Sequence, residues 1–72
     1  MKDERVILKE RLIKVGIDES NSETIALDAG SSQCIVNKLY LIESGIPSQF
    51  IEKALKEIVL FYMGELFEVD ES

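Results

Sequence analysis

The stretch ESGIPSQFIEKAL, residues 43–55, decides how the carboxyl-terminal half of the chain folds. Gly45 is suited to end a helix, because glycine adopts the left-handed backbone conformation at little cost. Pro47 suits the first turn of a new helix, and Ser48 is an alternative N-cap. The stretch therefore predicts a corner between two helices, with a long helix starting at residue 47 or 48.

The helix that follows this corner is expected to be the longest, running to about Phe67. It carries one apolar stripe, made of Ile51, Leu55, Ile58, Tyr62 and Leu66. A further apolar row, Val59, Met63 and Phe67, follows at i, i+4, i+8. A helix that is apolar nearly all round is buried on several sides. A 72-residue chain has too few other elements to cover it.

We therefore expect this helix to pack against a second copy or another protein. The predicted interface residues are Ile58, Val59, Leu60, Phe61, Met63 and Phe67. Gly64 is expected inside the helix, where it would allow a close helix crossing at a cost of about 1 kcal/mol relative to alanine.

The amino-terminal half of the chain has weaker secondary-structure patterns. Residues 2–17 predict a helix ending at Gly16, although residues 12–17 also alternate as a short strand would. Residues 24–28 suit either a helix, with Ser20 and Glu23 at capping-box spacing, or a short strand. A helix over about residues 33–44 would follow, capped by Ser31 or Ser32. Its expected inward face is Ile35, Val36, Leu39 and Ile42.

Length and composition predict one mainly α-helical domain over residues 1–72, with three helices and a frayed acidic tail at 68–72. A core this small supplies about 3–5 kcal/mol, so small domains need a further source of stability. The chain has a single cysteine and no histidine, which excludes an intrachain disulfide and a Cys/His zinc site. Assembly as a homodimer or higher homo-oligomer is therefore expected, with no metal and no cofactor.

The net charge of −6 is unevenly distributed. Residues 1–15 hold five basic and three acidic side chains, whereas residues 16–72 hold three lysines and eleven acids. An acidic body repels DNA and anionic membranes. The longest apolar run, residues 58–63, is far below the roughly 20 residues of a membrane span. The charged amino terminus and the unpaired cysteine favour a cytoplasmic protein without a signal peptide.

Residues 24–62 resemble the ribbon-helix-helix regulators. The residues that correspond to the turn and second helix of that family are Gly45, Ser48, Ile51, Ala54 and Leu55. The resemblance implies a dimer whose paired strands, here near residues 24–28, enter the DNA major groove. Thr24, Ala26 and Ser48 would be the DNA-binding residues, and Asp28 would face outward as well. A helix-turn-helix is a further alternative, but its second helix is too apolar to lie in a groove.

Catalysis is not expected, because the chain lacks the histidine that general acid–base chemistry most often uses. Cys34 has no histidine partner and is best explained as a small, partly buried side chain, although it would lie near a helix start. We therefore predict a non-enzymatic protein-interaction module, a regulatory or accessory factor of the kind that phages, plasmids and bacteria encode. The alternatives are a DNA-binding regulator and an acidic inhibitor that imitates nucleic acid through its carboxyl-terminal carboxylates.

Overall fold

A computed structural model of the chain describes residues 3–67. It contains four helices, α1 (Glu4–Val15), α2 (Glu19–Ala29), α3 (Lys38–Glu43) and α4 (Ser48–Met63). The mainly helical class is confirmed, but the expected number of three helices is wrong. Both strand alternatives are wrong as well, because residues 12–15 close α1 and residues 24–28 lie inside α2. The predicted acidic tail at 68–72 falls outside the described residues.

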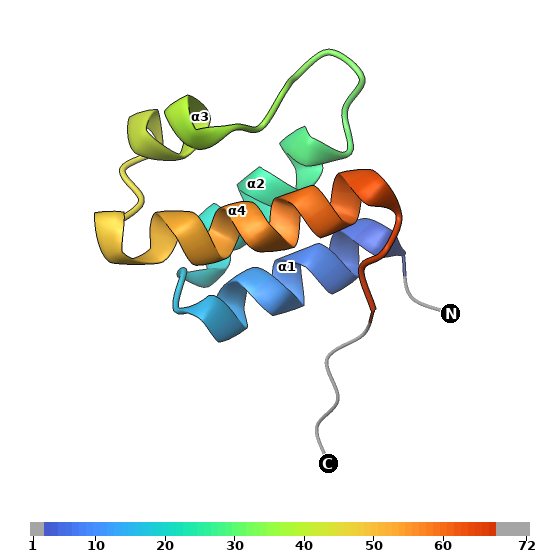
Figure 1. Cartoon of the computed structure of the whole chain (residues 1–72), viewed down its shortest axis with the longest axis horizontal. Coiled ribbons are helices and arrows are strands. Elements are labelled where there is room, and N and C mark those ends of the chain that lie inside the picture. The colour runs from blue at the N-terminus through green and yellow to red at the C-terminus, as the bar shows by residue number, and fades with distance from the viewer. Residues whose placement is uncertain (1–2, 68–72) are drawn as a thin grey trace.

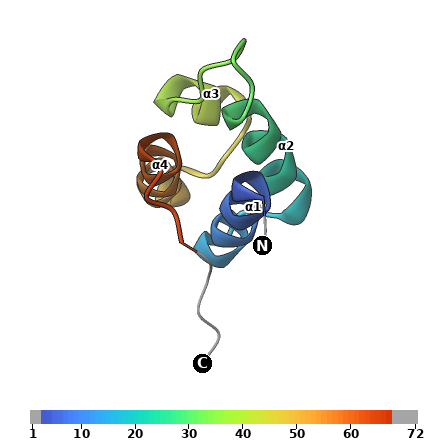
Figure 2. The same ribbon diagram turned by 90° about the vertical axis from the view of Figure 1, so that its right-hand side faces the viewer.

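The four helices surround one core. In Figure 1, α1 and α2 form an antiparallel hairpin, and α4 lies along α1 in the opposite direction. Figure 2 shows α2 and α4 on either side of α1, with α3 at the far side of the core. α1 packs against both α2 and α4, and α3 packs against α4. α4 therefore packs against both α1 and α3.

Three of the helices begin at an acidic or amide side chain that accepts a backbone N–H. Asp3 caps α1 through Arg5 N at 2.8 Å, and Asp18 caps α2 through Asn21 N at 3.1 Å. Asn37 caps α3 through Tyr40 N at 3.0 Å. These are the side chains that N-caps prefer. The predicted caps at Ser20, Ser31 and Ser32 are therefore wrong.

Glycines end three of the helices in the same way. Gly16, Gly45 and Gly64 have φ values of 123°, 81° and 72°. After each glycine, the next N–H bonds to the carbonyl five residues before it, as in Ile17 N to Leu12 O and Ile46 N to Leu41 O, both at 3.1 Å. This pattern satisfies carbonyls that the helix end leaves open. The expected stops at Gly16 and Gly45 are confirmed.

Gly64 corrects the predicted extent of α4. Its N–H bonds to Phe61 O, and Glu65 N bonds to Leu60 O at 2.9 Å. The helix therefore ends at Met63 instead of continuing to Phe67, and Gly64 is its cap rather than an interior residue. The turn sends Leu66 back into the core, where only 9% of it is exposed.

The core draws on all four helices and on the turns between them. Its members are Ile7, Leu8, Leu12, Ile17, Ile25, Ala26, Ala29, Val36, Leu41, Ile46, Ile51, Ala54, Ile58 and Leu66. Ile17 and Ile46, which follow the capping glycines, are both buried. Ser22 is fully buried too, and its hydroxyl donates to Ile17 O at 3.3 Å. Both turns are thus held by core packing as well as by capping.

The predicted inward face of the segment 33–44 is wrong apart from Val36. Residues 31–37 are not helical, and α3 starts at Lys38. This delayed start makes Leu41 the inward side chain of α3, with 0% exposed. Leu39 and Ile42, which were expected inside, are instead 61% and 52% exposed. The change of register leaves α3 with apolar side chains on its outer surface.

Candidate interaction surface

Exposed apolar side chains are concentrated on α3, α4 and the residues just before α3. We call the following set the α3–α4 surface: Ile35, Leu39, Ile42, Val59, Tyr62 and Met63. Each of these side chains is at least half exposed. Val6, Ile13 and Leu27 are the exposed large apolar residues described on α1 and α2. α3 packs against α4, and the hydroxyl of Tyr62 reaches Val36 N in the segment before α3, so the three segments that carry this set are in contact with one another.

The predicted interface residues of α4 fall into three groups. Val59 and Met63 project outward with 51% and 61% exposed, and Phe67, beyond the end of the helix, is 75% exposed. Leu60 and Phe61 are half-buried against the core. Ile58 is a core residue, with 1% exposed, because it shares the inward stripe of Ile51 and Ala54. Ile58 is therefore corrected from interface to core.

Two open depressions lie beside the exposed apolar side chains of α3 and of the segment before it. One, of about 410 Å³, lies between α3 and the start of α4, and it is lined by Lys38, Ile42, Ser48, Gln49, Ile51 and Glu52. The other, of about 420 Å³, lies on the outer side of α3, and it is lined by Ile35, Asn37, Leu39, Tyr40, Glu43 and Ser44. The surface thus combines projecting apolar groups with hollows that have both apolar and charged walls.

Two tyrosine hydroxyls fix α3 in place. Tyr40 donates to Oδ2 of Asp28 on α2, and the hydroxyl of Tyr62 on α4 accepts from Val36 N at 3.2 Å. Burial, together with the hydrogen bond to Asp28, raises the pKa of Tyr40 to about 12. Tyr40 is therefore a neutral donor at physiological pH. These bonds hold the segment before α3 and α3 itself against α2 and α4.

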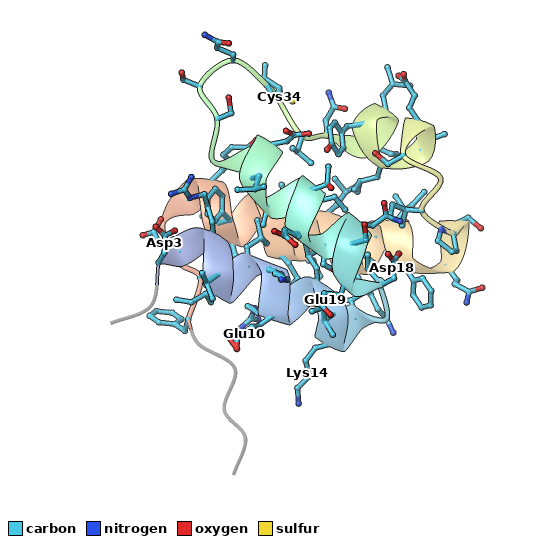
Figure 3. The ribbon with its side chains drawn as sticks, turned by 180° about the vertical axis from the view of Figure 1, so that it is seen from behind. Asp3, Glu10, Lys14, Asp18, Glu19 and Cys34 are labelled. Atoms are coloured by element: carbon cyan, nitrogen blue, oxygen red, sulfur yellow. The ribbon has the colours of Figure 1, made fainter. Side chains whose placement is uncertain are left out.

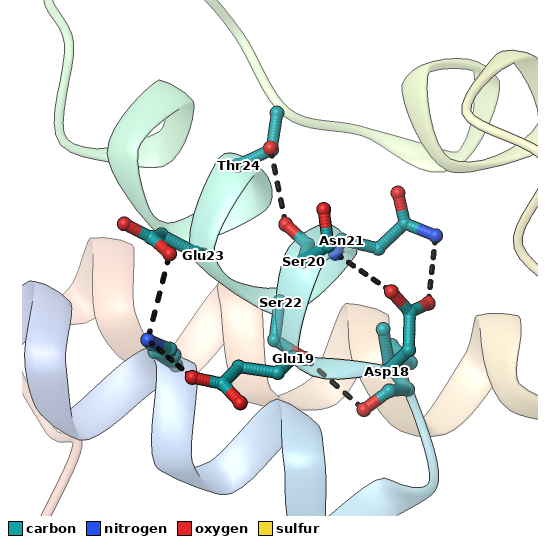
Figure 4. A network of polar contacts seen from close by, with 9 residues as sticks. Asp18, Glu19, Ser20, Asn21, Ser22, Glu23 and Thr24 are labelled. Carbon is teal, nitrogen blue, oxygen red and sulfur yellow. Dashed lines mark hydrogen bonds and ion pairs between the residues drawn. The ribbon is translucent and has the colours of Figure 1, made fainter.

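The basic residues near the amino terminus are largely engaged within the fold. Lys9 Nζ lies 3.5 Å from Oε1 of Glu19 and 3.6 Å from Oε2 of Glu23. Figure 4 labels these two glutamates on α2. Arg11 pairs with Glu57 of α4 and also donates to Phe67 O at 2.9 Å. Arg5 pairs with Asp3, and its hydrogen bonds hold the pKa of that carboxyl below the usual value. Lys9 and Arg11 of this basic segment therefore connect α1 to α2 and α4 through ion pairs.

The residues that the ribbon-helix-helix resemblance assigned to DNA do not come together. Thr24 is exposed on α2, where its hydroxyl donates to Ser20 O at 3.1 Å (Figure 4). Ala26 lies in the core with 2% exposed, so it is corrected from a DNA-binding position to a packing position. Ser48 is exposed at the first residue of α4. The strand that would enter a groove is a helical segment here.

Cys34 lies partly buried in the non-helical segment between α2 and α3, as Figure 3 shows. Its predicted place near a helix start is wrong, because α3 begins only at Lys38. Among residues 3–67, no group of three or more histidine, cysteine, aspartate or glutamate side chains is arranged to hold a metal ion. Within the same range, no helix is both long and apolar enough to cross a membrane.

Three exposed residues escaped the sequence reasoning, namely Ile35, Leu39 and Ile42, which were assigned to the core. The signal that could have found them was Asn37, a strong N-cap residue that starts the helix later than Ser31 or Ser32 would. When the helix starts at residue 38, Leu41 faces the core, and Leu39 and Ile42 face solvent.

Comparison of the chain with family models, with curated proteins and with solved structures gives no match.

Proposed function

We propose that the chain is a non-enzymatic protein-interaction module that acts as a homo-oligomer, as a regulatory or accessory factor in the cytoplasm. The observation that carries this proposal is the exposed apolar α3–α4 surface, on which Ile35 is 77% exposed and Leu39 and Met63 are each 61% exposed. Exposed apolar area is unfavourable by about 25 cal/mol per Å², and its burial drives association. Apolar side chains gathered on one side of a small protein mark interaction sites.

The charge of this region also supports a protein partner. Residues 35–63 carry three lysines, Lys38, Lys53 and Lys56, against three glutamates, whereas the whole chain has a net charge of −6. Protein interfaces combine apolar groups with hydrogen-bonded polar groups. A nucleic-acid surface would need an excess of basic residues, which this region lacks. The α3–α4 surface therefore favours protein over nucleic acid.

A capture experiment with matched variants tests this proposal. The tagged full chain, Leu39→Glu, Met63→Glu and the control Leu27→Glu would each be incubated with an extract of the native cell. Leu27 is 53% exposed on α2 and does not belong to the α3–α4 surface, so it controls for adding a carboxylate to an exposed leucine. Circular dichroism melting would establish that all four proteins are folded.

The expected result is one set of proteins captured by the wild type and by Leu27→Glu, and lost with the other two variants. Mass spectrometry of the bound fractions identifies the set. Equal capture by all four proteins would contradict an interaction through the α3–α4 surface.

A further inference from the structure

The exposed side of α4 forms a single ridge. It consists of five exposed residues at positions i, i+4, i+8, i+11 and i+15, namely Ser48, Glu52, Lys56, Val59 and Met63. Residues at these spacings lie on the same side of a helix. With a rise of about 1.5 Å per residue, this α4 ridge is about 22 Å long.

The two ends of the α4 ridge have opposite shapes. Near the carboxyl end, Val59 and Met63 project outward. Near the amino end, Ser48 and Glu52 border the depression of about 410 Å³, whose other wall includes Ile42 of α3. A twofold axis across the middle of the ridge would place the projecting end of one copy over the hollow end of the other. A surface that carries both shapes is self-complementary in this sense.

The charges on the ridge fit the same arrangement. Glu52 and Lys56 are four residues apart, so two antiparallel α4 helices related by an axis at the level of residue 54 place each Glu52 opposite Lys56 of the other copy. In this register Val59 of one copy lies at the level of Gln49 of the other, which lines the depression, and Met63 lies at the level of the turn that leads into α4. Neither Glu52 nor Lys56 joins an ion pair within residues 3–67, so both are available.

The charge of this region is compatible with self-association. Two copies with a net charge of −6 each repel one another, and the repulsion is weakest where the local charges cancel. Residues 35–63 are such a region, with as many lysines as glutamates. A strongly basic partner would instead be attracted to the acidic parts of the chain.

We infer that a second copy of this chain occupies the α3–α4 surface, in a twofold dimer with antiparallel α4 helices and Glu52 of each copy against Lys56 of the other. The inference rests on the proposed function, because it names the partner of the surface on which that function depends.

Charge reversal on the full chain tests the register directly. Sedimentation equilibrium would compare the wild type with Glu52→Lys, Lys56→Glu and the double variant Glu52→Lys/Lys56→Glu. Each single variant places like charges opposite each other twice in the dimer, and it is expected to weaken dimerisation by about tenfold or more. The double variant restores opposite charges and is expected to recover the wild-type dimer. A 1:1 mixture of the two single variants is expected to form a heterodimer.

Lys53→Glu is the matched control, because Lys53 is exposed on α4 but lies off the ridge. It makes the same charge change as Lys56→Glu and is expected to leave the dimer intact. Circular dichroism would show that every variant keeps its helices, so that a lost dimer is not a lost fold.

The outcomes separate this inference from the proposed function. The inference would be overturned if the wild type were a monomer at about 100 µM. It would also be overturned if Lys53→Glu weakened the dimer as much as Lys56→Glu does, or if the double variant failed to recover the dimer. None of these results decides whether Leu39→Glu and Met63→Glu lose the captured proteins, which is the test of the proposed function. A recovered double variant with an unaffected Lys53→Glu would support the antiparallel register.

Discussion

Arg11 on α1 donates from Nε to Oε1 of Glu57 on α4, a residue 46 positions further along the sequence. The same guanidinium donates from Nη1 to Phe67 O at 2.9 Å. One side chain therefore fixes both α4 and the segment that turns back after Gly64. This contact helps to hold Leu66 in the core.

Replacing Arg11 with methionine is expected to lower the free energy of unfolding by about 2 kcal/mol, because Glu57 would lose its partner while mostly buried. Only 14% of the Glu57 side chain is exposed. Urea denaturation measures the change. The double variant Arg11→Met/Glu57→Met is expected to be more stable than the sum of the single effects, since both charges are then removed. Additive single effects would contradict coupling between the pair.

Replacing Gly16 with alanine is expected to destabilise the fold more than replacing Gly64 with alanine. Gly64 is in the left-handed region, where a non-glycine residue costs about 1 kcal/mol, and Gly16, at φ 123°, lies outside that region, so alanine there costs at least as much. A Cβ at residue 16 would also lie 2.8 Å from Cε1 of Phe50, whereas one at residue 64 would meet nothing within 4 Å. Thermal unfolding compares the two. An equal loss would show that Phe50 moves aside freely, and Gly16→Ala/Phe50→Leu should recover part of the difference.

Replacing Asn37 with alanine is expected to destabilise α3 by about 1 kcal/mol, because the first turn loses its side-chain cap. Asn37 Oδ1 accepts from Tyr40 N at 3.0 Å, and α3 has only six residues in which to compensate. Hydrogen exchange of the α3 amides measures the loss. Asn37→Asp keeps an acceptor and should preserve protection, and Ser32→Ala should have no effect. Faster exchange in Ser32→Ala than in Asn37→Ala would contradict the assigned cap.

The stability of the fold is expected to decrease as the pH rises from 10 to about 12. Burial raises the pKa of Tyr40 from 10.0 to about 12, so in this range the unfolded chain releases a proton that the folded chain retains. Tyr40 therefore contributes its full stabilisation below pH 10 and loses it through the folded pKa. Urea denaturation at several pH values measures this decline. It should be shallower in Tyr40→Phe, and an identical pH dependence in both proteins would contradict the role of Tyr40.

Local sequence patterns were sufficient for some parts of the fold. The stops at Gly16 and Gly45 were predictable, because each glycine is followed by an isoleucine that becomes buried. The inward stripe of α4 was predictable at Ile51 and Ile58 from the helical period. The outward row of Val59 and Met63 was predictable from the same period, since it falls on another side of the helix.

Other parts of the fold were not predictable, because several residues carry the same local signal for a helix start or a helix end. Ser31, Ser32 and Asn37 are all acceptable caps, and only the packed structure selects Asn37. That choice places Leu39 and Ile42, two of the six residues of the α3–α4 surface, on the outside. Gly64 suited either a helix interior or a helix end, and the chain ends the helix there so that Leu66 can pack.

The sequence by itself determined that this is a small helical chain with helix ends at Gly16 and Gly45, because capping and helical periodicity are properties of a few neighbouring residues. The tertiary structure alone decided that Arg11 reaches Glu57 and Phe67, that Tyr40 reaches Asp28, and that Leu41 is the inward residue of α3. These relationships join segments distant in the chain, and their geometry is set by how the helices pack around the shared core. This packing leaves some apolar side chains of α3 and α4 exposed to solvent.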